Sequence, residues 1–101
     1  MVFNYTDLEL TLTVDPGYLD RLENVYVSIE TEDIRLSIKA DPADIDPETD
    51  TVRLELTQEV TGKLQGRALV QVNGFINGKR WASEQGQIMF RRNLLEEVVE
   101  P

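Results

Sequence analysis

The side chains that most often carry enzymatic chemistry are missing from this sequence. It contains no His and no Cys, which removes the usual proton carrier near neutral pH, the thiol nucleophile and the common zinc ligands. Paired carboxylates could still hydrolyse a glycosidic bond, but the Asp and Glu residues fall at strand-surface and loop positions. The glycines are too dispersed for a phosphate-binding loop. We therefore expect no catalysis and no cofactor.

One acidic segment, residues 41–50 (DPADIDPETD), is a weak candidate for a calcium site. Four carboxylates fall at every second position: Asp44, Asp46, Glu48 and Asp50. Hard cations prefer clustered carboxylate oxygens, but the segment lacks the central Gly of an EF-hand loop and contains Pro47. Its two prolines also predict a surface loop that does not join a β-ladder. A solvated charged loop is the simpler interpretation.

Five residues of the second half are weak candidates for contact with a partner: Gln71, Asn73, Lys79, Arg80 and Trp81. Gln71 and Asn73 alternate along an expected strand and would expose amides on one face. Trp81 follows two cations and could form an aromatic platform for a sugar ring or a partner side chain. Burial of the single Trp in the core, and solvation of the amides, are the simpler interpretations.

Charge is unevenly distributed along the chain, whose formal net charge is −9. Residues 1–50 carry 13 Asp plus Glu against 3 Lys plus Arg, and residues 51–101 carry 6 against 7. An acidic protein has little attraction for nucleic acid or anionic lipid, so we expect neither as a partner. The simpler interpretation is a solvated acidic surface. The alternative is an acidic face that meets the more basic end of a neighbouring copy, a heterologous contact that builds rings or tubes.

Length and composition predict one soluble domain. The chain has 101 residues, of which 41% are hydrophobic, and a core divides only beyond about 250 residues. No apolar run approaches the roughly 18 residues that span a bilayer, and the first residues, MVFNYTDLE, lack the pattern of a secretion leader. We expect a chain made in the cytoplasm with no membrane partner.

Alternation of apolar and polar residues predicts strands in the first half. Residues 6–14 place four aliphatic residues on one face of a strand, and Asp15-Pro16-Gly17 predicts the turn that ends it. Residues 18–23 are expected to form a loop or a short helical turn. Residues 25–29 and 34–38 alternate again around a short polar connection, which predicts a hairpin.

The second half continues the same period. Residues 52–56 alternate, residues 58–64 fit one helical turn or an irregular crossover, and residues 69–76 are β-rich, with Gly74 the expected place for a bulge. Asn77-Gly78 predicts a two-residue hairpin turn, and residues 81–83 and 87–92 supply the returning strands. Asn93 could cap a brief helical turn, because Leu94, Leu95, Val98 and Val99 follow at helical spacing.

Together these patterns predict an all-β fold, an antiparallel β-sandwich of the immunoglobulin-like or jelly-roll-like kind. We expect about seven strands in a single domain over residues 1–101, with at most one or two short helical turns.

The second half also resembles small proteins encoded by phages and prophages of Gram-positive bacteria. The resemblance covers Thr51 to Val99 and lies in the order of LELTQEVTG, GRALVQV, NGKRWAS and NLLEEVV. The matching positions are Leu56, Thr57, Gln58, Glu59, Thr61, Gly66, Val70, Gln71, Val72, Gly78, Lys79, Ala82 and Ser83.

This resemblance implies a non-catalytic virion structural or assembly protein of the tail, baseplate or fibre. Such a protein would be made in the bacterial cytoplasm, carried in the virion, and would form homo-oligomers and contacts with other phage structural proteins. Two alternatives remain. One is a carbohydrate-binding module that uses Trp81. The other is a small inhibitor that imitates nucleic acid, which requires five carboxylates on one face: Asp7, Glu9, Glu30, Glu32 and Asp33.

Overall fold

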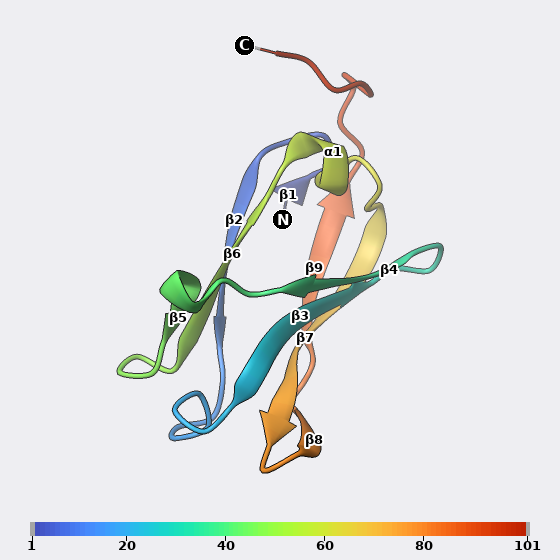
Figure 1. The fold of residues 1–101 in the computed structure, drawn as a ribbon. Helices are drawn as coiled ribbons and strands as arrows, with labels where there is room; N and C mark the ends of the chain where they lie inside the picture. The colour runs from blue at the N-terminus through green and yellow to red at the C-terminus, as the bar shows by residue number, and fades with distance from the viewer. Residues whose placement is uncertain (1, 101) are drawn as a thin grey trace.

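The computed structural model describes residues 2–100, which form two β-sheets in a sandwich-like, all-β arrangement (Figure 1). The larger sheet has six strands in the order β1-β9-β7-β3-β4, with β8 also paired to β7, and the smaller has three in the order β2-β6-β5. The strands are β1 (Val2–Phe3), β2 (Leu8–Thr13), β3 (Glu23–Glu30), β4 (Arg35–Lys39), β5 (Ile45–Asp46), β6 (Thr51–Leu56), β7 (Gly66–Ile76), β8 (Lys79–Ala82) and β9 (Gly86–Arg91).

The predicted fold class is confirmed, although the strands number nine in the described residues and not about seven. The two additional strands, β1 and β5, are only two residues long. Every pairing is antiparallel except that of β1 with β9, which is parallel and joins the first strand to the last. The smaller and larger sheets form the two layers visible in Figure 1.

The three-stranded sheet follows from the alternation in its sequence. Along β2 the residues alternate between half-buried and exposed, and β6 alternates between buried and exposed. The register pairs Leu10 with Leu54 and Glu9 with Glu55, so the leucines face the other sheet and the glutamates face solvent. Period two therefore determines which face of this sheet is apolar.

The six-stranded sheet is built around β7, which pairs with β3 along one edge. Its other edge pairs with β9 in its first half and β8 in its second half. The predicted β3–β4 hairpin and the Asn77-Gly78 turn between β7 and β8 are both present. Asn77 and Gly78 have φ of 52° and 76°, which is the positive-φ pair that such a turn requires.

A single hydrophobic core lies between the two sheets. It contains Val27, Ile29, Val70, Val72 and Phe90 from the six-stranded sheet. Val52, Leu54 and Leu56 come from the three-stranded sheet and belong to the same cluster. Burial of these side chains in one cluster joins the two sheets into one core.

We predicted a bulge at Gly74, and the structure places it opposite that residue, on the partner strand β3. Glu23 pairs with Phe75 and Tyr26 pairs with Asn73, so that two residues of β3 oppose the single Gly74. Asn24, one of those two, has φ of 54°. A Cβ on Gly74 would lie 2.9 Å from Leu22 Cδ2, so the glycine makes room for the Leu22 side chain, which precedes the bulged strand.

The acidic segment joins a ladder after all, contrary to our prediction. Pro42–Asp44 forms a short 3-10 helix, η1, and Ile45–Asp46 then pairs with β6 as the edge strand β5. The prolines are accommodated because Pro42 occupies the first turn of η1, where no backbone N–H is needed, and Pro47 lies just beyond β5. Most of the segment is exposed.

The expected helical turn after β6 is present, and the one at the C-terminal end is not. Helix α1 (Gln58–Thr61) follows β6, whereas residues 92–100, called the tail below, contain only bends. Asn93 Oδ1 accepts a hydrogen bond from Leu95 N at 3.1 Å, which is an Asx turn and not a helix cap. Among residues 2–100 no helix combines the length and apolar character needed to cross a membrane.

Candidate interaction face

The outer face of the six-stranded sheet gathers five cations from four strands. The pairing registers place on this face Arg35, Lys39, Arg67, Arg80 and Arg91. The carboxylates on the same face are Glu23 and Glu30. The face is therefore net positive, although the chain as a whole has a formal charge of −9.

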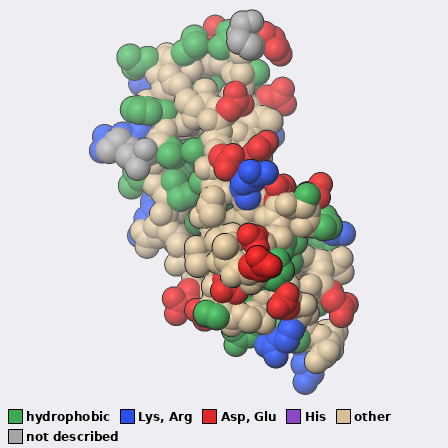
Figure 2. Space-filling model, turned by 90° about the vertical axis from the view of Figure 1, so that its left-hand side faces the viewer, with side chains coloured by type: hydrophobic (Ala, Val, Ile, Leu, Met, Phe, Trp, Pro, Cys, Tyr) green, Lys and Arg blue, Asp and Glu red, His purple; other side chains and the backbone are tan. Residues whose placement is uncertain are grey.

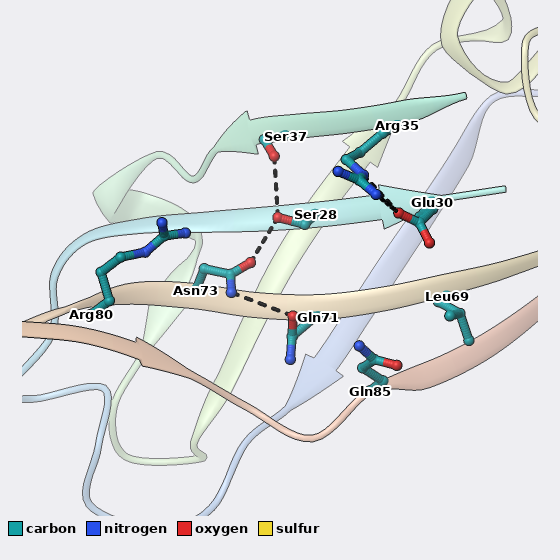
Figure 3. Close-up of a pocket in the computed structure, with 9 residues that line it drawn as sticks. All are labelled: Ser28, Glu30, Arg35, Ser37, Leu69, Gln71, Asn73, Arg80 and Gln85. Atoms are coloured by element: carbon teal, nitrogen blue, oxygen red, sulfur yellow. Dashed lines mark hydrogen bonds and ion pairs between the residues drawn. The ribbon is translucent and has the colours of Figure 1, made fainter. Parts of the chain in front are cut away.

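A row of hydroxyl and amide side chains crosses the middle of this face (Figure 3). Ser28 Oγ lies 3.2 Å from Ser37 Oγ and donates to Asn73 Oδ1 at 2.7 Å. Asn73 Nδ2 donates to Gln71 Oε1 at 3.5 Å, and Gln71 Nε2 donates to the Ser83 carbonyl at 2.8 Å. The row links β4, β3 and β7, so the amides are half-buried and already bonded to one another.

This row lies in a shallow hollow of about 330 Å³. Glu30 and Arg35 lie towards one end, joined by a hydrogen bond of 2.6 Å from Arg35 Nε to Glu30 Oε2, and Arg80 lies at the other end (Figure 3). Pockets for small molecules are mostly apolar and enclose their ligand. This open, polar hollow is suited to single side chains of a partner.

Four residues at the margin of the face combine two cations with two exposed apolar side chains. They are Phe3, Arg67, Met89 and Arg91, called the margin patch below. Met89 lies opposite Arg67, and Phe3 lies beside Arg91 on the adjacent strand. Phe3 is 49% exposed and Met89 is 48% exposed. Neither arginine belongs to any of the ion pairs found within residues 2–100.

The outer face of the three-stranded sheet has the opposite charge. Glu9 and Glu55 lie directly opposite each other, and Asp46 occupies β5. Among residues 2–100, the one cation on this face is Arg53, whose pKa is raised by its hydrogen bond with Asp44 and by the nearby Glu9 carboxylate. In Figure 2 Asp and Glu side chains are spread over much of the side shown, and hydrophobic side chains gather at the upper left.

The structure separates the residues that we expected to contact a partner. Gln71, Asn73 and Arg80 lie together around the hollow. Trp81 pairs with Gly74 and faces the other side of the sheet, where its ring stacks on Tyr18 with centroids 4.9 Å apart. Lys79 is exposed and is not among the residues that line the hollow. Packing of the tryptophan therefore fits the structure better than an exposed aromatic platform.

The acidic segment does not bring its carboxylates together as a metal site. Asp44 bonds to Arg53 at 3.2 Å, Asp46 accepts from Glu48 N, and Asp50 accepts from Gly17 N. Residues 2–100 contain no group of three or more acidic side chains placed to hold a metal ion.

The five carboxylates considered for imitation of nucleic acid do not share one face. Glu9 is on the outer face of the three-stranded sheet and Glu30 is on that of the six-stranded sheet. Glu32 and Asp33 lie in the turn between β3 and β4. The geometric condition for that function is not met.

Sequence reasoning missed four members of the cationic face: Arg35, Lys39, Arg67 and Arg91. Each occupies a polar position in an alternating run, so its exposure could be inferred. Their common face depends on which strands pair, and that information is absent from local patterns.

Comparison with known proteins gave no relative from which a function could be transferred: no protein-family model, curated protein or solved structure matches this chain.

Proposed function

We propose that the protein is a non-catalytic assembly component that acts through protein–protein contacts on the outer face of its six-stranded sheet. The observation that carries this proposal is the concentration of cations there in a strongly acidic chain. The sequence resemblance over Thr51–Val99 supports a place for it in phage or prophage structures, in contact with itself and with other structural proteins.

The charge pattern supports a contact surface more than a solvated surface. A net charge and a mixture of positive and negative side chains are sufficient for solubility. Solubility does not require positive and negative side chains to lie on opposite faces. Complementary potentials direct association and set its orientation. Arginine is also enriched in protein interfaces, whereas lysine is depleted, and four of the five cations on this face are arginines.

Apolar exposure supports the same surface. Phe3 and Met89 are the large apolar residues of the two sheets that remain exposed, and both belong to the margin patch. An interface needs an apolar centre within a polar rim. The margin patch provides the apolar part of such an interface, and the hydrogen-bonded row of serine and amide side chains provides a polar border on the same face.

The test is the association state of the pure chain. We expect sedimentation velocity to show oligomers that grow with concentration and weaken between about 0.05 and 0.5 M salt, because salt screens exposed charges. The variant Arg67→Glu/Arg91→Glu should dissociate at concentrations where the wild type associates. A matched control, Lys63→Glu/Lys79→Glu, makes the same change in net charge off this face and should associate normally. A chain that stays monomeric at every concentration would contradict the proposal.

A further inference from the structure

We propose that the margin patch of one copy binds the tail of a second copy of this chain. This inference rests on the proposed function and names the partner. The tail, residues 92–100, supplies every exposed large apolar residue of the described chain outside the margin patch: Leu94, Leu95, Val98 and Val99. In the described part of the chain, the exposed large apolar side chains thus lie in one patch on the sheet and in one short segment.

The margin patch and the tail also carry charges of opposite sign. The margin patch carries Arg67 and Arg91, which make no ion pair within residues 2–100. The tail carries Glu96, Glu97 and Glu100 against a single cation, Arg92, and Arg92 is already paired with Glu96. Glu97 and Glu100 therefore remain for the two arginines of a neighbouring copy.

Hydrogen bonds to the rest of its own chain hold the tail in place near both of its ends. Gln58 Nε2 donates to the Val99 carbonyl at 2.7 Å and Val99 N donates to Gln58 Oε1 at 2.9 Å. At the start of the tail, Asn93 N donates at 2.7 Å to the side chain of Asn4, which is buried. These contacts restrain both ends of the segment, which lowers the ordering cost of binding.

The same contacts keep the tail off its own margin patch. Gln58 belongs to α1, which directly follows β6 of the three-stranded sheet, so the tail is tied to that side of the molecule. Figure 1 shows the tail leaving the end of β9 and projecting beyond the sandwich. Leu94 is 92% exposed there. The patch on the sheet stays open, and a second copy is the occupant that carries the complementary segment.

A contact between a tail and the sheet of the next copy joins two different surfaces, and it is heterologous where every tail passes in the same direction. Repetition of such a contact gives a ring when the rotation closes and a filament when it does not. Where two copies exchange tails reciprocally, the same contact closes a dimer. The contact therefore predicts self-association that increases with concentration.

The test uses full-length variants in sedimentation velocity, with circular dichroism to verify the fold. Because the tail is exposed, Leu94→Ser/Leu95→Ser/Val98→Ser should leave the fold intact, and we expect it to raise the dissociation constant about tenfold or more. Glu97→Arg/Glu100→Arg should do the same.

Combination of Glu97→Arg/Glu100→Arg with Arg67→Glu/Arg91→Glu in one chain should restore association, because the charges of both surfaces are then reversed. The control Glu59→Arg/Glu84→Arg changes the net charge equally and should associate as the wild type does.

The outcomes separate this inference from the proposed function. Loss of association in the Arg67→Glu/Arg91→Glu variant, with normal association of both tail variants, would overturn the tail as occupant while the cationic face remained an interface. Failure of the four-residue reversal to restore association would also overturn it. A monomeric wild type would contradict both.

Discussion

At the scale of single residues, Thr61 joins two segments that are far apart in sequence. Its side chain is fully buried in α1, accepts a hydrogen bond from Thr6 N at 3.0 Å and donates one to Thr6 O at 2.6 Å. The hydroxyl of Thr61 thus satisfies the backbone N–H and C=O of Thr6, which lies between β1 and β2, as a neighbouring strand would do. Buried backbone groups without a partner are costly.

We expect Thr61→Val to lower the free energy of unfolding by about 1–3 kcal/mol, because the isosteric change leaves both backbone groups of Thr6 unpaired. Urea denaturation measures the change. Thr57→Val is the matched control, since Thr57 is exposed and makes no side-chain cap bond. Equal effects of the two substitutions would show that the hydroxyl bonds of Thr61 do not contribute.

The cross-strand pair Glu9 and Glu55 is the second residue-scale feature. Like charges directly opposite each other in a ladder are destabilising. Arg53 is attracted mainly to Asp44 and Glu9, with Glu55 the weakest contributor, so removal of Glu55 relieves repulsion at little cost.

We therefore expect Glu55→Gln to raise the melting temperature by about 1–5 °C at low ionic strength. The gain should shrink in high salt, where exposed charges are screened. Differential scanning calorimetry at two salt concentrations measures it. Glu84→Gln, an equal charge change outside the ladder, should have a smaller effect, and a gain independent of salt would contradict the electrostatic cause.

Single residues also mark the limit of what the sequence could predict about the site. The exposure of Gln71 and Asn73 towards one side followed from alternation along one strand. Their hydrogen bonds to each other and to Ser28 did not, because Ser28 lies on a different strand. The separation of Trp81 from Arg80 could have been inferred from their adjacency, since neighbours in a strand face opposite ways.

At the scale of elements, period two correctly predicted the long strands, because one face of each is buried in the core. The wrong predictions concern segments in which no buried face determines the secondary structure. Ile45–Asp46 is an edge strand too short to show a period, and the tail has helical spacing without a surface against which a helix could pack. The bulge was assigned to the glycine, whereas the extra residue lies on β3 near Asn24.

The turn between β7 and β8 depends on local backbone conformation. Gly78 has φ of 76°, where a side chain is strained, so we expect Gly78→Ala to lower the free energy of unfolding by about 1–2 kcal/mol. Gly86→Ala is the control, because a Cβ there would lie 3.6 Å from Val70 Cγ2, an ordinary contact. Thermal unfolding followed by circular dichroism compares the two. A neutral Gly78→Ala would show that another turn type forms.

At the scale of the whole molecule, charge segregates by sheet face and not by halves of the chain. Arg35 and Lys39 come from the acidic first half, yet they join Arg67, Arg80 and Arg91 of the second half on one face. The fold interleaves the two halves, since β7 and β9 pair within the sheet that also holds β3 and β4. Counting charges along the sequence detected the imbalance but assigned it to the wrong surfaces.

The single core predicts that the two sheets unfold together. Leu56, in the three-stranded sheet, is 2% exposed, and Trp81, in the six-stranded sheet, packs against the same cluster. Leu56→Ala should therefore lower the free energy of unfolding by about 2–5 kcal/mol. Tryptophan fluorescence and far-ultraviolet circular dichroism should report the same reduced midpoint, because small single domains unfold in one cooperative transition.

The control Leu94→Ala removes an exposed leucine of the tail and should leave the midpoint unchanged by both probes. A fluorescence midpoint that stays at the wild-type value while the dichroism midpoint falls would mean that the six-stranded sheet is stable without the three-stranded sheet.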